Sequence, residues 1–173
     1  MVVVERLPNP DAGNEAGDAP AQPPPSESAL GERHLLHLQT PSLPGNERAA
    51  TSQVMAAIKA SMSLPQPLFE RVATAVAETV MNAIEHGNRF QADKVALVDV
   101  WASPQRLRIR VVDQGGGPPI PTTPEPDLEA KLAGLQSPRG WGLFLIKNMV
   151  DEMQIQTDDA HHIVDLIFVL RSV

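Results

Sequence analysis

The sequence predicts an α+β fold, a two-layer α/β sandwich in which helices pack on one face of a mainly antiparallel sheet. Three observations lead to this prediction. Several short segments alternate apolar and polar residues, which is typical of half-buried strands. Longer segments have apolar residues three and four apart, which is typical of amphipathic helices. The segments follow one another in the order β-α-α-β-β-loop-α-β-β, which favours hairpins in one sheet rather than repeated β-α-β units.

The first 29 residues differ in composition from the rest of the chain. They hold five acidic residues and one arginine, and three consecutive prolines occupy positions 23–25. Large apolar residues are almost absent between positions 8 and 28, so burial cannot offset the entropy of ordering this stretch. We therefore predict a disordered, acidic, proline-rich tail over residues 1–29 and one domain over residues 30–173.

The composition excludes several classes of function. The formal net charge is −7 and the pI is about 5.1, so we expect no broad cationic surface and no direct binding to nucleic acid. Cysteine is absent, which excludes disulfides, thiolate metal sites and cysteine nucleophiles. No apolar run approaches the roughly 20 residues of a membrane helix, and no signal-peptide core is present. We expect a cytoplasmic protein without a membrane partner.

The first half of the domain is predicted to contain one strand and two helices. Residues 33–39 have strand-like content and are closed by prolines. Helical spacing extends over residues 46–60, with Asn46 as a plausible N-cap. Two prolines then start a longer helix over residues 68–86, and Gly87 ends it.

The second half is predicted to contain two hairpins separated by a loop and a helix. The loop is dense in glycine and proline, and loops of this length inside a domain are usually functional or disordered. The predicted strands span residues 94–101, 106–112, 153–156 and 163–170, with a loop over 113–139 and a helix after residue 142.

The long helix has two distinct faces. One face is apolar and would pack on the sheet: Phe69, Val72, Val76, Val80, Ala83 and Ile84. Glu78, Asn82 and Glu85 lie on the other face, because residues three and four apart are neighbours on a helix. This pattern is also that of an ordinary solvated face. However, the last two turns contain no lysine or arginine, whereas a solvated face usually has charges of both signs.

A second motif lies at the end of a predicted strand, where Asp113 is followed by Gln114 and three glycines. An aspartate in this position can accept a hydrogen bond from an exocyclic amine, and residues without a Cβ let the backbone approach a planar ring. A simple glycine-rich turn that begins with aspartate is the alternative.

The third motif is Gly140-Trp141-Gly142 at the start of the last helix, with Arg139 before it. A helix N-terminus has free N–H groups and a partial positive charge, which suit a phosphate. A glycine-rich helix cap beside an exposed arginine is the alternative. The motif is neither a Walker A loop nor a dinucleotide-binding fingerprint, because it lacks the required lysine and no β-α-β unit surrounds it.

In this order, the three motifs resemble the Bergerat ATP-binding fold of the GHKL (histidine-kinase-like) ATPases. Residues 78–88, ETVMNAIEHGN, look most like the corresponding helix of the anti-sigma factor serine/threonine kinases. Residues 140–146, GWGLFLI, are similar to the last helix of that family. The resemblance covers roughly residues 35–170.

The resemblance implies a role for each motif in binding ATP and Mg²⁺. Glu78 would be the general base, Asn82 the magnesium ligand and Asp113 the residue that recognises adenine. The implied backbone and phosphate contacts are those of Gly115, Gly117, Arg139, Gly140, Gly142 and Leu143.

The same resemblance implies an ATP-dependent serine/threonine kinase that acts as an anti-sigma factor. Such a protein would sequester a sigma factor and phosphorylate a small STAS-type anti-anti-sigma protein. An ATP-binding partner-switch module without significant kinase turnover remains an alternative, because it needs the same residues. The ATPase half of a histidine kinase is disfavoured, since no helical hairpin with a phosphoacceptor histidine precedes the domain. Whether the protein forms a homodimer is left open.

Overall fold

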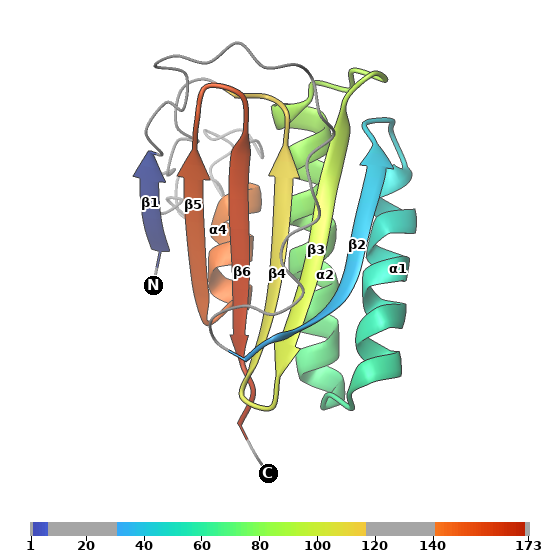
Figure 1. Cartoon of the computed structure of the whole chain (residues 1–173), viewed down its shortest axis with the longest axis vertical. Coiled ribbons are helices and arrows are strands. Elements are labelled where there is room, and N and C mark those ends of the chain that lie inside the picture. Colours follow the sequence, from blue (N-terminus) through green and yellow to red (C-terminus); the bar gives the residue numbers. More distant parts are fainter. Residues whose placement is uncertain (1, 7–30, 117–140, 172–173) are drawn as a thin grey trace, which may run out of the picture.

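The protein forms one six-stranded sheet covered by helices on one face (Figure 1). The structure is a computed structural model that describes residues 2–6, 31–116 and 141–171. Its elements are β1 (Val2–Arg6), β2 (Arg33–Pro41), α1 (Asn46–Ser61), α2 (Gln66–Asn82), a π-helical turn (Ala83–Gly87), β3 (Val95–Ser103), β4 (Arg106–Asp113), α4 (Trp141–Met149), β5 (Glu152–Thr157) and β6 (His162–Val169). The predicted α+β sandwich is confirmed.

The sheet has the strand order β1-β5-β6-β4-β3-β2. Every pair is antiparallel except β1 with β5, which is parallel. The hairpins β3–β4 and β5–β6 are those expected from the sequence. Because β4 and β6 pair in the centre, the last residue of β4 lies opposite the first residue of β6.

Strand β1 corrects the prediction for the N-terminus. The composition predicts that residues 2–6 belong to the disordered tail, but Val2–Arg6 pair with Met153–Thr157 at the edge of the sheet. Three consecutive valines suit a strand, and the edge of β5 offers unpaired backbone groups to them. Residues 7–30, the rest of the predicted tail, lie outside the described residues, as do residues 117–140 of the predicted loop.

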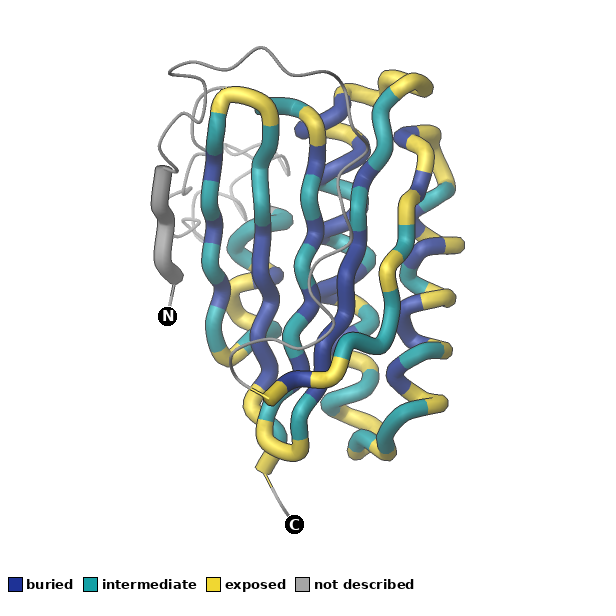
Figure 2. Tube along the Cα trace, in the orientation of Figure 1, coloured by how far each residue is buried: buried dark blue, intermediate teal, exposed yellow. Residues whose placement is uncertain are grey.

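The core lies between the sheet and the helices. The alternation of apolar and polar residues along the strands predicted which side chains are buried in it. In β4, Leu107, Ile109 and Val111 are buried, and in α2 the apolar face packs inward in the same way (Figure 2). Phe69 is only partly buried at the margin of this core. The strands therefore present alternate residues to the helices, as the period of two requires.

Two predicted helix ends differ from the structure. The N-cap of α1 is Gly45, whose φ of 92° is left-handed, whereas the Asn46 amide donates to the carbonyl oxygen of Pro41 at 2.9 Å. The second helix was expected to be α-helical to residue 86, but its last turn, Ala83–Gly87, is π-helical. There the N–H of Asn88 donates to the carbonyl oxygen of Ala83, five residues back, at 2.8 Å.

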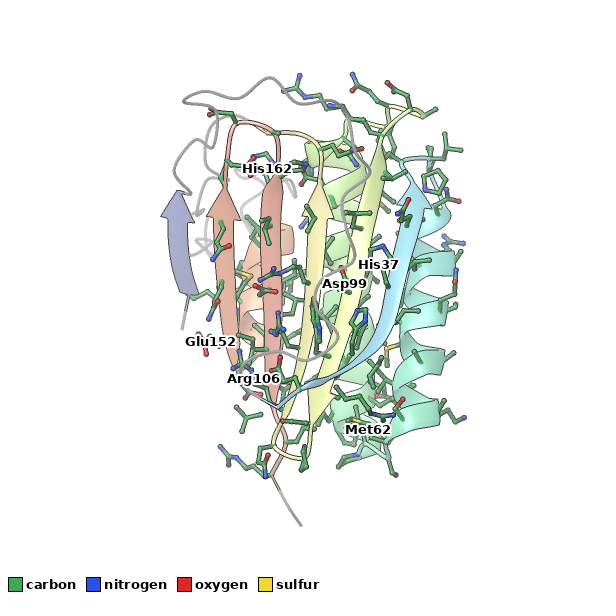
Figure 3. The ribbon with its side chains drawn as sticks, viewed as in Figure 1. His37, Met62, Asp99, Arg106, Glu152 and His162 are labelled. Atoms are coloured by element: carbon green, nitrogen blue, oxygen red, sulfur yellow. The ribbon has the colours of Figure 1, made fainter. Side chains whose placement is uncertain are left out.

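The sheet face opposite the helices has buried aspartates that contact histidine and arginine side chains. His34 Nε2 and His37 Nδ1 lie 2.9 and 2.8 Å from the same oxygen of Asp99. Arg110 donates two hydrogen bonds to Asp165, at 2.9 and 2.7 Å. These hydrogen bonds raise the pKa of the Arg110 guanidinium above its ordinary value, even though burial acts in the opposite direction. Figure 3 shows His37 and Asp99 close together on the neighbouring strands β2 and β3.

Candidate nucleotide-binding site

Asp113, the predicted adenine residue, is the last residue of β4 and is 5% exposed. Its Oδ1 accepts a hydrogen bond from the N–H of Gly115 at 2.8 Å. His162 Nδ1 lies 3.0 Å from the same oxygen, because His162 is the residue opposite Asp113 across the β4–β6 pair. A carboxylate held in this way has one defined orientation at the end of β4. Figure 3 shows its neighbour His162 at that end of the sheet.

Two glycines pack directly against this carboxylate. A Cβ added to Gly87, at the end of the π-helical turn, would overlap the carboxylate of Asp113. A Cβ added to Gly115 would lie 2.5 Å from the carbonyl oxygen of Gly87 and 2.8 Å from Asp113 Oδ1. Real Cβ atoms do not approach so closely, so both positions require glycine for reasons of space.

Asn88 joins the end of the helix to the end of the strand, and sequence reasoning did not identify it as a site residue. It is fully buried, and its amide donates to Ser42 Oγ at 2.8 Å. Its Oδ1 accepts from the N–H of Gln114 at 2.7 Å. Gln114 Oε1 in turn accepts from the N–H of Val95 at 2.8 Å. The available signal was an amide side chain immediately after the glycine that ends the helix.

Glu78 and Asn82 lie one turn apart on α2, so their Cβ atoms are about 5–6 Å apart. Both residues are half-buried, whereas Glu85 is exposed. Of the three polar residues predicted on this helix face, Glu78 and Asn82 therefore form a half-buried pair, and Glu85 is an ordinary surface glutamate. Thr79 between them is buried and donates to the carbonyl oxygen of Ala75 at 2.7 Å.

The start of α4 lies against Asn82. A Cβ added to Gly142 would be 3.1 Å from Asn82 Nδ2 and 3.2 Å from its Oδ1. At the other end of α4, Arg71 Nε donates to the carbonyl oxygen of Met149 at 3.1 Å. Leu143 is half-buried and packs against the core. The first turn of α4 is thereby placed beside the predicted magnesium ligand.

Three of the predicted site residues cannot be placed. Gly117, Arg139 and Gly140 lie outside the described residues, so their predicted contacts with the nucleotide stay predictions. The other six, Glu78, Asn82, Asp113, Gly115, Gly142 and Leu143, belong to α2, β4 with its following turn, and α4.

Among the described residues, the predicted magnesium ligand is the amide of Asn82 and not a cluster of carboxylates. Within residues 2–6, 31–116 and 141–171, no group of three or more histidine, aspartate or glutamate side chains could hold a metal ion. Mg²⁺ is commonly held by one or two protein oxygens, with phosphates and water completing its shell. The Asn82 amide oxygen, which lies beside the start of α4, fits that type of site.

One helix connects the two parts of the site. Asn82 and Gly87 are five residues apart on the same helical segment, which corresponds to a rise of about 7 Å. Asp113 therefore lies near one part of this segment, and the start of α4 lies near the other. The arrangement suits a ligand with a hydrogen-bond donor at one end and an anionic group at the other.

A groove of about 690 Å³ lies at the opposite end of the molecule, around Met62, Leu64, Leu68 and Val169. Figure 3 shows Met62 at the far end of the sheet from His162. None of the predicted site residues lines this groove.

Comparisons with known proteins agree with the fold. A family model described as the histidine kinase-like ATPase domain matches residues 40–168. Anti-sigma F factors of Bacillus thuringiensis (strain Al Hakam) and Bacillus mycoides (strain KBAB4) are 28% identical over 136 residues, which cover 74% of this chain and 86% of each relative.

A solved structure, that of the RsbU and RsbW domains of Rv1364c from Mycobacterium tuberculosis, aligns with a TM-score of 0.54. It is 19% identical, and the alignment covers 80% of this chain but only 33% of that one, so it shows likeness of fold alone. Among the described helices, none is long and apolar enough to cross a bilayer. The family match extends over well more than half of the sequence and implies ATP binding; the chain belongs to the histidine kinase-like ATPase domain family.

Proposed function

We propose that the chain is an ATP-dependent serine/threonine kinase that also acts as an anti-sigma factor. It would bind a sigma factor and transfer a phosphoryl group from ATP to a small STAS-type anti-anti-sigma protein. The main support is the arrangement of Glu78 and Asn82 one turn apart on α2, with Asn82 against the start of α4. The names of the relatives, both anti-sigma F factors, support this class of partner.

Asp113 would recognise adenine through its second carboxylate oxygen. Among the described residues, the hydrogen bonds from Gly115 and His162 both involve Oδ1. Oδ2 is then the oxygen available to the amino group of adenine, a charge-assisted hydrogen bond in a buried setting. Gly87 and Gly115 pack against this carboxylate, and their lack of a Cβ lets it keep its position at the end of β4.

Asn82 would hold Mg²⁺ through its amide oxygen, and the ion would neutralise charge on the phosphates. The first turn of α4 at Gly142 and Leu143 would donate N–H groups to the phosphates. The same role is proposed for Arg139 and Gly140, and Gly117 is proposed to contact the base. Glu78, half-buried beside Asn82, would accept the proton of the substrate hydroxyl.

Glu78→Gln tests the kinase assignment, and Glu85→Gln is its matched control. Both changes remove one negative charge from the same helical segment, but Glu85 is exposed and lies outside the half-buried pair. Phosphoryl transfer to a small STAS-type protein would be measured with labelled ATP. We expect Glu78→Gln to lower the transfer rate by about 10²-fold or more with little change in ATP affinity, and Glu85→Gln to leave both unchanged.

The same experiment separates the kinase from the alternative function. Transfer at the wild-type rate by Glu78→Gln would remove the general-base role. If the wild-type chain transfers no phosphate but binds its partner only with ATP, the chain is a partner-switch module instead.

A further inference from the structure

His162 makes a contact that the proposed roles above do not explain. It is the first residue of β6, and its side chain is 11% exposed. Nδ1 lies 3.0 Å from Asp113 Oδ1, although the two residues are 49 positions apart. The contact is between side chains that face each other across a paired strand, so the backbone of the sheet determines the position of both.

The geometry gives His162 a directional effect on Asp113. Oδ1 receives the N–H of Gly115 from one side and lies beside His162 Nδ1 as well. With its proton on Nδ1, a neutral imidazole donates to this oxygen. Two donors on one oxygen fix the rotation of the carboxylate, and Gly87 packs against it. The other oxygen is thereby held in place for a ligand.

We infer that His162 is a positioning residue for base recognition, and that protonation of its imidazole weakens the binding of adenine nucleotides. This inference rests on the proposed binding of ATP at Asp113. The amino group of adenine brings a positively polarised hydrogen to the carboxylate. A protonated imidazole at the same carboxylate makes it a weaker acceptor and repels that hydrogen, so affinity falls as the pH falls.

Other ionisable groups lie near His162 and must be separated from it. His161, the adjacent residue, is 42% exposed, and its Nδ1 lies 3.4 Å from Asp158 rather than near Asp113. Among the described residues, the charged or titratable groups that neighbouring elements carry at this end of the sheet include Asp113 on β4, Asp158, Asp159 and His161 in the turn before β6, Glu85 and His86 in the π-helical turn, and Asp93 and Lys94 before β3.

Three variants of the full chain test the inference: His162→Asn, His162→Ala and His161→Asn. The asparagine amide nitrogen occupies nearly the position of the histidine Nδ1, so His162→Asn keeps a donor to Asp113 but does not titrate. His162→Ala removes the donor. His161→Asn removes a neighbouring imidazole that does not contact Asp113. Calorimetry would give the dissociation constant of Mg-ATP from about pH 8.5 to about pH 5.5, the range in which imidazoles titrate.

At about pH 8 we expect His162→Ala to weaken Mg-ATP binding about three- to tenfold, and His162→Asn to bind almost as the wild type does. Between about pH 8 and pH 5.5, the wild type and His161→Asn should lose more affinity than His162→Asn, whose profile should be flatter. Inosine triphosphate lacks the amino group, so its weaker binding should be the same in the wild type and His162→Ala.

Two failures can be distinguished. If the wild type binds Mg-ATP and all three variants have its affinity and its pH profile, the role of His162 is wrong while the ATP-binding function stands. If the wild type binds ATP and inosine triphosphate equally at every pH, adenine recognition by Asp113 is wrong, and the role of His162 falls with it.

Discussion

Two regions of this protein bury carboxylates, and the two regions differ in the partners that they give to the carboxylate oxygens. On the sheet face opposite the helices, Asp99 and Asp165 each lie against two or more cationic or titratable side chains. At the end of the sheet, Asp113 is held on one oxygen by a backbone N–H and one histidine, with glycines packed around it. All three aspartates are at most 5% exposed.

This difference distinguishes an aspartate that stabilises the fold from an aspartate that can bind a ligand. Asp165 has both oxygens in hydrogen bonds to Arg110, so its charge is matched inside the protein. In the described part of the chain, Asp113 has such contacts at Oδ1, and the surrounding glycines keep side chains away from it. A buried carboxylate whose two oxygens are both hydrogen-bonded within the protein contributes to stability. A buried carboxylate with such bonds at one oxygen can accept a hydrogen bond from a ligand at the other. Burial alone does not distinguish the two.

The largest effect is expected at Asp165. Asp165→Ala removes both hydrogen bonds to Arg110, whose side chain is 33% exposed, and the ion pair with Arg108. Hydrogen bonds to charged groups are worth about 1.5–3 kcal/mol each, so the expected cost is about 3 kcal/mol. We expect the free energy of unfolding, measured with urea, to fall by this amount, while the affinity of the folded protein for Mg-ATP stays unchanged. The double variant Arg110→Met with Asp165→Leu should recover most of the loss. An unfolding free energy within about 1 kcal/mol of wild type for Asp165→Ala would contradict the comparison.

For Asp113→Asn we expect the opposite result: ATP affinity should fall while stability stays almost unchanged. The asparagine oxygen can still accept from Gly115, so the free energy of unfolding should stay close to that of the wild type. The charge-assisted hydrogen bond to adenine, worth roughly 1.5–3 kcal/mol, would be lost. Calorimetry should then show ATP affinity reduced by about tenfold or more. Unchanged affinity would remove the adenine assignment.

Gly87→Ala should lower both the stability of the fold and the affinity for ATP, since its Cβ would overlap the Asp113 carboxylate. Overpacking of this kind costs about 1–3 kcal/mol of stability, and the displaced carboxylate should bind ATP more weakly. Gly45→Ala is the contrasting change: its Cβ would meet nothing within 4 Å, but its φ of 92° is unfavourable for alanine. It should lower the melting temperature without changing ATP affinity. Equal ATP affinity in the two variants would show that Gly87 does not position Asp113.

The smallest effect concerns Asp158, in the turn between β5 and β6. Partial burial raises the pKa of Asp158, but hydrogen bonds from the N–H groups of Ala160 and His161, with the charge of His161, lower it further than burial raises it. A carboxyl with a lowered pKa stabilises the fold above its unfolded pKa, and this contribution is lost as the pH falls through the folded value. Asp158→Asn should therefore cost less than about 1 kcal/mol at neutral pH, and nothing at a pH below that folded value. Urea unfolding at both pH values would measure it; an equal loss at both would exclude a charge effect.

Much of the fold follows from local patterns in the sequence. The alternation in residues 106–112 and the helical spacing after Pro67 predicted β4 and α2, because each side chain's face depends only on its position in a regular element. The same patterns put Asp113 at a strand end and Glu78 one turn before Asn82. Sequence reasoning thus identified the elements of the candidate site and most of the residues that the structure places near one another.

The contacts that hold the site together were decided by the tertiary structure. His162 meets Asp113 because β6 pairs with β4 in one register, and Asn88 meets Ser42, 46 positions away, because the π-helical turn packs on the sheet. Strand β1 forms because β5 offers an unpaired edge at the other end of the chain. Periodicity reports which face of its own element a residue occupies, but not which distant residue lies opposite. Pairing between elements depends on the free energy of the whole packed sheet, so these contacts had no local signal.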